Sequence, residues 1–348
     1  MILHICFPSK FINQFVMFMS RHFYSAEHEF LFTSTENDLR RSDPQTHALL
    51  ECDDSPFRVW YYADERHLLT RNTKLFRALY GCEKIILHGL FLPMRISQIL
   101  CYCPSLLRKS YWVMWGGDFY SPEDKGPTHK RLIRNVEYLV TFVSGDISYV
   151  VANYQASGTP IECLAYPSNV FQPMRRPARK DKKTRIQVGN SATSTNRHEE
   201  IFCWLTEYKD REIEVICPLS YGDKQYADTI IALGTKIFSE KFIPLTEFMP
   251  LEEYVDLLAS IDIAIFNHNR QQGMGNIITH LGYGHKVYLR SDQNSWGMFV
   301  EKGIKVYDVL EGIDIDYVPS NRNRELVAEH FSLDRLVEQW RMIYESTP

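Results

Sequence analysis

The chain has 348 residues, of which 45% are hydrophobic and 24% are charged. This composition is typical of a soluble globular protein and excludes a disordered chain, and the length allows two domains of ordinary size. The formal net charge of -4 argues against a protein that binds nucleic acid over its whole surface, so we expect no nucleic-acid partner. No apolar run approaches the roughly 18 residues that span a bilayer, and we expect no signal peptide.

Motifs for disulfides and metal ions are missing from the sequence. The eight cysteines are scattered and no pair has C-x-x-C spacing, which predicts buried thiols in a reducing cytoplasm. No Asp-x-Asp pair follows a predicted strand, and no His/Cys spacing fits a metal site. We therefore expect neither a metal nor a cofactor.

The first half of the chain alternates short apolar runs with amphipathic segments, which predicts strands alternating with helices. The polar stretch at 34–57 gives no clear prediction. Strands are expected at 1–6, 30–33, 58–62, 84–87, 111–115 and 138–143, and helices at 11–23, 65–79, 93–101 and 130–137.

Three of these strands end in short polar loops, at 88–89, 116–118 and 144–146. In a parallel sheet the carboxyl ends of the strands gather at one edge. The carboxylate of Asp118 and the imidazole of His88 would then face one cleft, where either could act as a base. The alternative for each is a helix N-cap or a satisfied structural polar group.

A basic, proline-bearing segment at 175–185 interrupts the pattern and is interpreted as a linker. We infer two β/α domains that face each other across a cleft, 1–172 and 173–330, closed by a C-terminal helix at 331–348. This architecture suits a nucleotide-dependent transferase, in which one domain holds the donor diphosphate and the other presents a base and the acceptor pocket. Strands of the second series are expected at 186–188, 214–217, 236–238, 261–266, 286–289 and 304–307, with helices between them and at 333–344.

The loop after the predicted strand at 261–266 carries the features of a diphosphate site. Gly273 and Gly275 let the backbone come close to a ligand at the start of the next helix, whose free N–H groups attract anions. Arg270 adds a fixed positive charge with a planar fork of donors. A second loop, at 189–196, is rich in hydroxyl and amide groups that can donate to phosphate or ribose. The alternatives are turn glycines, a surface arginine and a helix cap.

An ordered set of short motifs is spread over most of the chain: His88-Gly89, Trp115-Gly116-Gly117-Asp118-Phe119-Tyr120, Gly145-Asp146, Val188-Gly189-Asn190-Ser191, Asn196, His198, Arg270-Gln271-Gln272-Gly273-Met274-Gly275, Asn294 and Trp296. This set resembles the TDP-4-acetamido-4,6-dideoxygalactose (Fuc4NAc) lipid II transferases of enterobacterial common antigen synthesis, the 4-alpha-L-fucosyltransferases of glycosyltransferase family 56. It departs from that family at Gly117, where Ala is expected, and at Asn276, where Thr is expected.

The resemblance implies a GT-B glycosyltransferase fold of two Rossmann-like domains, a TDP-Fuc4NAc donor and a polyprenyl-diphosphate-linked glycan acceptor. It also implies peripheral attachment at the cytoplasmic face of the bacterial inner membrane, in polysaccharide synthesis of the enterobacterial common antigen or O-antigen type. Asp118 is the candidate base and His88 the second candidate, while Trp115 and Asp146 are assigned to the acceptor. The donor is assigned to Gly189, Asn190, Ser191, Asn196, Tyr221, Arg270, Gln271, Gln272, Gly273, Met274, Gly275 and Asn276.

Contact with a membrane surface would use basic side chains, and each one near an anionic surface contributes about 1 kcal/mol. One candidate is the segment at 175–185, and the alternative for it is a solvated charged face. The other candidate is the cluster of Lys125, Lys130, Arg131 and Arg134.

Two other functions stay open at this point: a sugar-nucleotide epimerase of GT-B shape, and a non-catalytic protein that binds a nucleotide sugar or a glycan. The stereochemistry is open as well. An inverting transferase needs a base for the acceptor hydroxyl, whereas a retaining one does not strictly require it.

Overall fold

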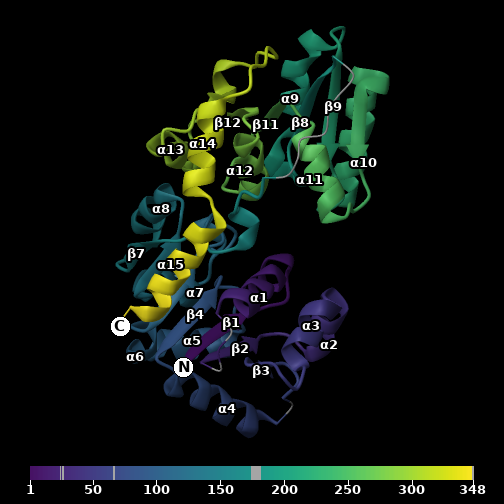
Figure 1. Cartoon of the computed structure of the whole chain (residues 1–348). Helices are drawn as coiled ribbons and strands as arrows, with labels where there is room; N and C mark the ends of the chain where they lie inside the picture. The colour runs from purple at the N-terminus through teal and green to yellow at the C-terminus, as the bar shows by residue number, and fades with distance from the viewer. Residues whose placement is uncertain (24, 26, 66, 174–181, 347–348) are drawn as a thin grey trace. The chain divides into compact units, whose positions relative to one another are not determined.

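Figure 1 shows the computed structural model of the chain, which describes residues 1–23, 25, 27–65, 67–173 and 182–346. The chain forms two compact units. One contains Met1–Ser168 together with Asp334–Pro348, and the other contains Asn169–Leu333. Each unit is built on one parallel β-sheet with helices between the strands, as the alternating sequence pattern predicts.

The first unit contains seven strands, β1 (Ile2–Cys6), β2 (His28–Phe32), β3 (Arg58–Tyr61), β4 (Lys84–His88), β5 (Ser110–Val113), β6 (Tyr138–Thr141) and β7 (Thr159–Glu162). They are all parallel and lie in the order β3-β2-β1-β4-β5-β6-β7. The strands β1, β4 and β5 are buried over their whole length, because helices cover both faces of the sheet. The strand order changes direction between β1 and β4, which is where ligands bind in open α/β sheets.

The connecting helices of the first unit are α1 (Lys10–His22), α2 (Glu36–Ser42), α3 (Pro44–Glu51), α4 (Leu68–Gly81), α5 (Met94–Tyr102), α6 (Pro104–Leu107), α7 (Pro127–Asn135) and α8 (Ser144–Tyr154). Connections between parallel strands are right-handed, so α1 to α3 cover one face of the sheet and α4 to α8 cover the other. The stretch at 34–57, which gave no prediction, forms α2 and α3. Its polar residues are partly N-caps: the side chain of Thr35 accepts from Asp38 N, and Asp43 accepts from Gln45 N.

The terminal helix α15 (Leu333–Glu345) belongs to the first unit. The indole of Trp340 is fully buried and donates to the carbonyl of Ala165 at 2.9 Å. The ammonium of Lys84 donates to the carbonyls of Ile343 at 2.6 Å and Tyr344 at 2.8 Å. These bonds satisfy carbonyl groups at the end of the helix and place a positive charge there, where the helix dipole favours it.

The second unit contains six parallel strands, β8 (Thr184–Val188), β9 (Ile213–Pro218), β10 (Phe242–Leu245), β11 (Ile263–Phe266), β12 (Lys286–Leu289) and β13 (Tyr307–Asp308). Their order is β10-β9-β8-β11-β12-β13, so the switch point lies between β8 and β11. The helices are α9 (His198–Leu205), α10 (Lys224–Phe238), α11 (Leu251–Ala259), α12 (Met274–Gly282), α13 (Asn294–Glu301) and α14 (Asn321–His330).

Several boundaries expected from the sequence are wrong. Residues 236–238 are the end of α10, and the strand that pairs with β9 is β10. The predicted linker at 175–185 ends too late, because Thr184 and Arg185 already belong to β8; its residues 174–181 lie outside the described part of the chain. Cys52 and Cys203 are exposed, whereas buried thiols were expected.

None of the helices in the described residues is both long and apolar enough to cross a membrane.

Candidate functional site

The loop after β8 is held in shape by Asn196, whose side chain is fully buried. The Asn196 amide donates to the carbonyl of Ser191 at 3.1 Å and to the hydroxyl of Thr193 at 2.8 Å. Its carbonyl oxygen accepts from Asn190 N at 3.0 Å. Gly189 is needed at the start of this loop, because its φ is +65° and a Cβ there would lie 2.8 Å from Asn196 Oδ1. The structure thus gives Asn196 the role of positioning the loop.

The loop after β11 leads into α12 through Gly273, which has a φ of +67°. No side chain caps this helix, so the N–H groups of its first turn, at residues 274–276, have no intrahelical acceptor. A Cβ at Gly273 would lie 3.1 Å from Asn190 Cγ and 3.1 Å from His268 Cε1. The backbone at Gly273 therefore comes close to the loop after β8.

Side chains from three loops form one hydrogen-bonded chain at the carboxyl edge of the second sheet. The hydroxyl of Thr195 donates to Gln272 Oε1 at 2.7 Å, and Gln272 Nε2 donates to Asn190 Oδ1 at 3.3 Å. Asn190 Nδ2 then donates to the hydroxyl of Tyr221 at 2.9 Å. Tyr221 follows β9 and is also hydrogen-bonded with Ser191. The structure therefore brings together predicted donor residues from the loops after β8, β9 and β11.

Arg270 lies within electrostatic reach of this chain. Burial raises the pKa of Tyr221, and the hydrogen bonds with Ser191 and Asn190 and the charge of Arg270 oppose this rise. Burial first of all, together with the charges of His198 and Arg270, lowers the pKa of His268 to about 3. His268 is therefore neutral, and its Nε2–H donates to Asn196 Oδ1 at 3.0 Å. The half-buried Arg270 thus lies near His268 and Tyr221, and the neutral imidazole of His268 lies close to Gly273 at the start of α12.

The remaining predicted donor residues lie on the same segment. Met274 is buried in the core, while Gln271 and Gly275 are half-buried. Asn276 Nδ2 donates to the hydroxyl of Tyr254 on α11 at 2.9 Å. Asn276 therefore ties the first turn of α12 to the neighbouring helix.

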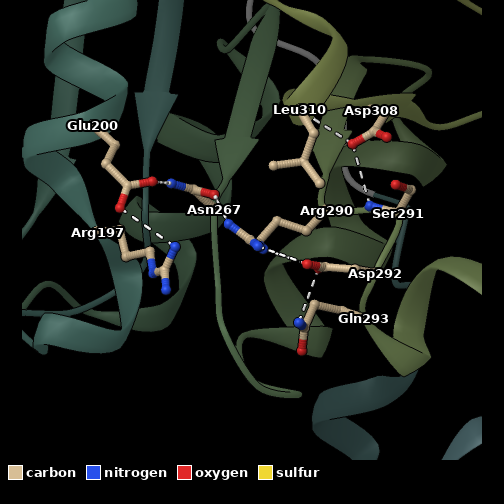
Figure 2. A network of polar contacts seen from close by, with 9 residues as sticks. All are labelled: Arg197, Glu200, Asn267, Arg290, Ser291, Asp292, Gln293, Asp308 and Leu310. Atoms are coloured by element: carbon tan, nitrogen blue, oxygen red, sulfur yellow. Dashed lines mark hydrogen bonds and ion pairs between the residues drawn. The ribbon is translucent and has the colours of Figure 1, made fainter.

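A second polar network, drawn in Figure 2, lies at the ends of β11 and β12. The guanidinium of Arg290 donates to both carboxylate oxygens of Asp292, at 3.0 and 2.6 Å, and to Asn267 Oδ1 at 3.2 Å. Asn267 Nδ2 donates to Glu200 on α9 at 2.8 Å, and Glu200 is paired with Arg197 at 3.4 Å. This network fixes Asn267, the first residue of the loop that carries Arg270. Sequence reasoning missed it, because the three groups that it joins, at 197–200, 267 and 290–293, lie far apart in the chain.

In the first unit, Asp118 joins the ends of β4 and β5. Its Oδ2 accepts from Leu90 N at 2.9 Å and from Trp112 Nε1 at 2.8 Å, and its Oδ1 accepts from Trp115 N at 3.1 Å. The side chain is fully buried. Burial raises its pKa, and the hydrogen bonds with Trp112, Leu90 and Trp115 oppose that rise. These contacts favour a positioning role for Asp118, since a general base must reach the proton that it removes.

His88 is part of a buried chain of three imidazoles. His28 Nδ1 lies 3.1 Å from His4 Nε2, His4 Nδ1 lies 3.1 Å from His88 Nε2, and His88 Nδ1 lies 2.9 Å from the hydroxyl of Tyr166. Trp115 Nε1 donates to the same hydroxyl at 2.7 Å. Burial lowers the pKa of His88 to about 3, so it is neutral. The chain thus ends at Trp115, at the carboxyl edge of the first sheet.

Aromatic side chains gather around Trp115 at this edge. The ring of Trp115 lies 5.3 Å from Phe7, 5.2 Å from Phe11 and 6.2 Å from Phe91 between centroids. Phe91 is 45% exposed, so one side of the cluster faces solvent. Three phenylalanines that sequence reasoning did not select therefore accompany Trp115, while the other predicted acceptor residue behaves differently. Asp146 is fully buried, and its Oδ1 accepts from the hydroxyl of Tyr120 at 2.6 Å.

The buried imidazoles predict that the protein is sensitive to acid. The pKa falls to about 4 for His28 and His198 and to about 3 for His88, His268 and His280, in each case first of all through burial. An unfolded chain takes up these protons near pH 6.5, and the folded chain does not. Stability is therefore complete above about pH 6.5 and falls as the pH drops from there towards the folded values.

At about pH 5 each of these histidines should lower the free energy of unfolding by roughly 2 kcal/mol. Several together can therefore exceed the stability of an ordinary domain. Urea unfolding at neutral pH and at about pH 5 measures this. Equal unfolding free energies at the two pH values would contradict the prediction, because the imidazoles would then be protonated in the folded protein too.

Two residues near the predicted donor group were missed although they lie in the selected loops. Thr195 is one hydroxyl among several in a loop chosen for its composition, and His268 directly precedes the polar part of the loop after β11. Tyr254 on α11 was also missed, since it contacts Asn276 only through the fold. Proximity along the chain could have found the first two, but not the third.

The arrangement in the second unit can bind an anion. Uncapped N–H groups at a helix start, a nearby guanidinium and a glycine that permits close approach are the elements of a phosphate site. Amide and hydroxyl groups of the neighbouring loops can add hydrogen bonds. A ligand with a diphosphate and further polar groups fits this chemistry.

Comparison with solved structures identifies the fold. HepE from Anabaena in complex with UDP is similar over 99% of this chain and 99% of that chain, with a TM-score of 0.69 and 10% sequence identity. A glycosyltransferase from Rickettsia africae has a TM-score of 0.69 and 12% identity over 99% of this chain and 97% of that chain. The lipopolysaccharide outer core galactosyltransferase WaaB has a TM-score of 0.58 and 10% identity, with 99% of each chain covered. The fold is therefore that of GT-B glycosyltransferases.

The family follows from the sequence. The model of the family described as 4-alpha-L-fucosyltransferase, glycosyl transferase group 56, matches residues 46–334, which is most of the chain. The match includes both Trp115 to Asp118 and the loop with Arg270. The chain therefore belongs to the 4-alpha-L-fucosyltransferases of glycosyl transferase group 56 and is a glycosyltransferase.

Proposed function

We propose that this glycosyltransferase transfers a deoxyamino sugar, Fuc4NAc, from a TDP donor to an undecaprenyl-diphosphate-linked saccharide in bacterial surface polysaccharide synthesis. The observation that carries the donor part is the uncapped start of α12 at Gly273, with Arg270 nearby and the chain from Thr195 to Tyr221 beside it. The UDP complex of the similar HepE supports a nucleotide diphosphate as the leaving group.

The chemistry requires that the charge on the departing diphosphate be stabilised. As the glycosidic bond breaks, negative charge grows on the diphosphate oxygen, and preorganised donors aimed at it lower the barrier. We assign this task to Arg270 and to the N–H groups at residues 274–276. The loop after β8, shaped by Asn196, supplies hydroxyl and amide donors for the rest of the nucleotide.

The acceptor is assigned to the carboxyl edge of the first unit. Trp115 and the surrounding phenylalanines offer a partly exposed aromatic surface of the kind that sugar-binding pockets use. Two buried side chains position Trp115. Asp118 accepts from Trp115 N, and His88 is hydrogen-bonded with the Tyr166 hydroxyl that accepts from Trp115 Nε1. Asp118 remains the candidate base for an inverting route. Its buried hydrogen bonds support a second role, in which the carboxylate positions Trp115 and does not act as a base.

An assay with purified protein, TDP-Fuc4NAc and a lipid-linked acceptor extract tests the proposal. Release of TDP that depends on the lipid fraction is the expected result. Conversion of the donor to a free epimerised sugar would instead identify an epimerase, and binding of TDP without turnover would identify a binding protein. Either of the last two outcomes would contradict the proposal.

Transfer should not depend on a divalent metal ion. The charge of the diphosphate is met by Arg270 and the start of α12, which together can replace the usual metal clamp. We expect the same rate of TDP release with and without EDTA. Complete loss of activity in EDTA that magnesium or manganese restores would contradict this assignment of the diphosphate site.

A further inference from the structure

The helices α4 to α7 on one face of the first sheet carry an unusual charge pattern. They contain no Asp or Glu, although the whole chain has a net charge of -4. Their basic residues are Arg71, Lys74, Arg77, Arg95, Lys130, Arg131 and Arg134. Lys74 is partly neutralised by Glu65, which precedes α4, at 3.1 Å. The helical layer as a whole is strongly positive.

The same layer exposes large apolar side chains. On α4, Leu69 is 82% exposed, and Phe76 and Tyr80 follow it after seven and eleven residues, so that the three lie on one stripe of the helix. On α5, Met94 and Tyr102 are 65% and 68% exposed and lie two turns apart. The opposite side of α4 is anchored by the buried core residues Leu75, Ala78 and Leu79.

These exposed side chains form one surface. Phe76 and Tyr80 stack at 6.1 Å between centroids, and Tyr80 is hydrogen-bonded with Cys103 at the end of α5. The guanidinium of Arg131 on α7 lies 5.2 Å from the ring centroid of Tyr102. Contacts between side chains therefore link the outer surfaces of α4, α5 and α7, which we call the α4–α7 face.

We infer that the α4–α7 face docks on a lipid bilayer that contains anionic lipids. Helices that carry exposed apolar side chains together with basic ones, and no acidic residue of their own, have the pattern of segments that lie in a membrane interface. The cations are attracted to anionic headgroups, while Leu69, Met94 and the tyrosines reach the acyl boundary. Leu69, the most exposed of these side chains, is aliphatic, which favours lipid over nucleic acid, whose bases stack on aromatic rings.

This inference takes the proposed function further, because a lipid-linked acceptor would be met at a membrane surface. Only the biological reason for membrane docking rests on the proposed function; the docking itself does not depend on it. Binding to vesicles is measured without donor or acceptor, so it can fail or succeed independently of sugar transfer. The α4–α7 face is a wider surface than the cluster of Lys125 and the cations of α7. It leaves out Lys125, whose ammonium donates to the carbonyl of Gly117 at 2.9 Å.

Cosedimentation with vesicles of phosphatidylcholine and phosphatidylglycerol tests the inference. We expect the wild type to bind these vesicles and to bind pure phosphatidylcholine much less. The pair Leu69→Ser and Tyr102→Ser should lower the partition coefficient by roughly tenfold or more, also at high salt. The pair Arg77→Gln and Lys130→Gln should lower it by roughly 30-fold at low salt, and less at high salt because ions screen the attraction.

The matched control is the pair Phe248→Ser and Val318→Ser in the second unit, at side chains that are 84% and 85% exposed. We expect this control to bind like the wild type. The inference is wrong if the wild type ignores the anionic vesicles, or if the apolar pair on α4 and α5 binds them as tightly as the wild type. Binding to single-stranded nucleic acid that competes with the vesicles, while the apolar pair has no effect, would also overturn it and would identify a polyanion site.

Discussion

Replacing Arg270 by Ala should weaken the binding of TDP by roughly 10- to 100-fold and lower turnover by roughly 10² to 10³. The guanidinium lies near Tyr221 and His268, at the edge where α12 begins without a cap. If it contacts the diphosphate, it stabilises the bound donor and, more strongly, the leaving TDP. Titration with TDP by calorimetry and release of TDP in the transfer assay measure the two effects separately.

Arg211→Ala is the matched control for this experiment. Arg211 precedes β9 and lines a hollow at the opposite, amino edge of the same sheet. The Arg211→Ala variant should bind TDP and turn over like the wild type. That result would show that the loss in Arg270→Ala does not come from a change in net charge. Wild-type values for Arg270→Ala itself would show that the loop after β11 is an ordinary turn and that the donor binds elsewhere.

Two further substitutions separate charge from geometry in the same loop. Arg270→Lys keeps the charge but loses the planar fork, so its affinity for TDP should lie between those of the wild type and Arg270→Ala. Gly273→Val should fail like Arg270→Ala for another reason. The φ of +67° disfavours a β-branched residue, and the new Cβ would lie 3.1 Å from Asn190 Cγ. These outcomes would distinguish a phosphate site from a general effect on stability.

The alternation of strands and helices could be predicted because each element has its own period and its own end signals. The unit from β11 to β12 is found where the sequence indicates it, with a short helix that ends at Gly282. The errors in the predicted elements arise where the local sequence pattern is weak or is overridden by an adjacent element. Residues 236–238 have the composition of a strand, but they are the last residues of α10, whose buried side is continued by Phe238. The polar helices α2 and α3 lack a strong apolar stripe and were therefore not predicted.

The candidate site divides in a similar way. The glycines and the polar loops mark the carboxyl edge of the second sheet from the sequence alone, because backbone approach and helix starts have local signals. The environment of Asp118 has no such signal. Its partners Leu90 and Trp112 come from a different strand end and from the interior of β5, so only the fold shows that the carboxylate is buried. The imidazole chain from His28 to His88 joins three strands and is hidden from the sequence for the same reason.

Replacing Asp118 by Asn should lower the free energy of unfolding by about 1 to 3 kcal/mol, the usual cost of leaving a buried hydrogen-bond donor without its acceptor. The carboxylate oxygens accept from Leu90 N, Trp112 Nε1 and Trp115 N. An Asn side chain has only one oxygen, so in either orientation its NH₂ group faces at least one N–H donor and leaves it without an acceptor. Urea unfolding measures this loss, with Asp124→Asn, at an exposed carboxylate in the same unit, as the control.

The same variant also decides between the two roles proposed for Asp118. A general base that is replaced by Asn lowers turnover by roughly 10² to 10⁴ while the fold and donor binding stay intact. A positioning carboxylate lowers stability first, and its loss should move Trp115 because the Trp115 N–H is one of the three bonds. We expect lower stability together with a changed indole fluorescence and an unchanged affinity for TDP, since the donor loops belong to the other unit. Wild-type stability combined with a large loss of turnover would contradict the positioning role and identify Asp118 as the base.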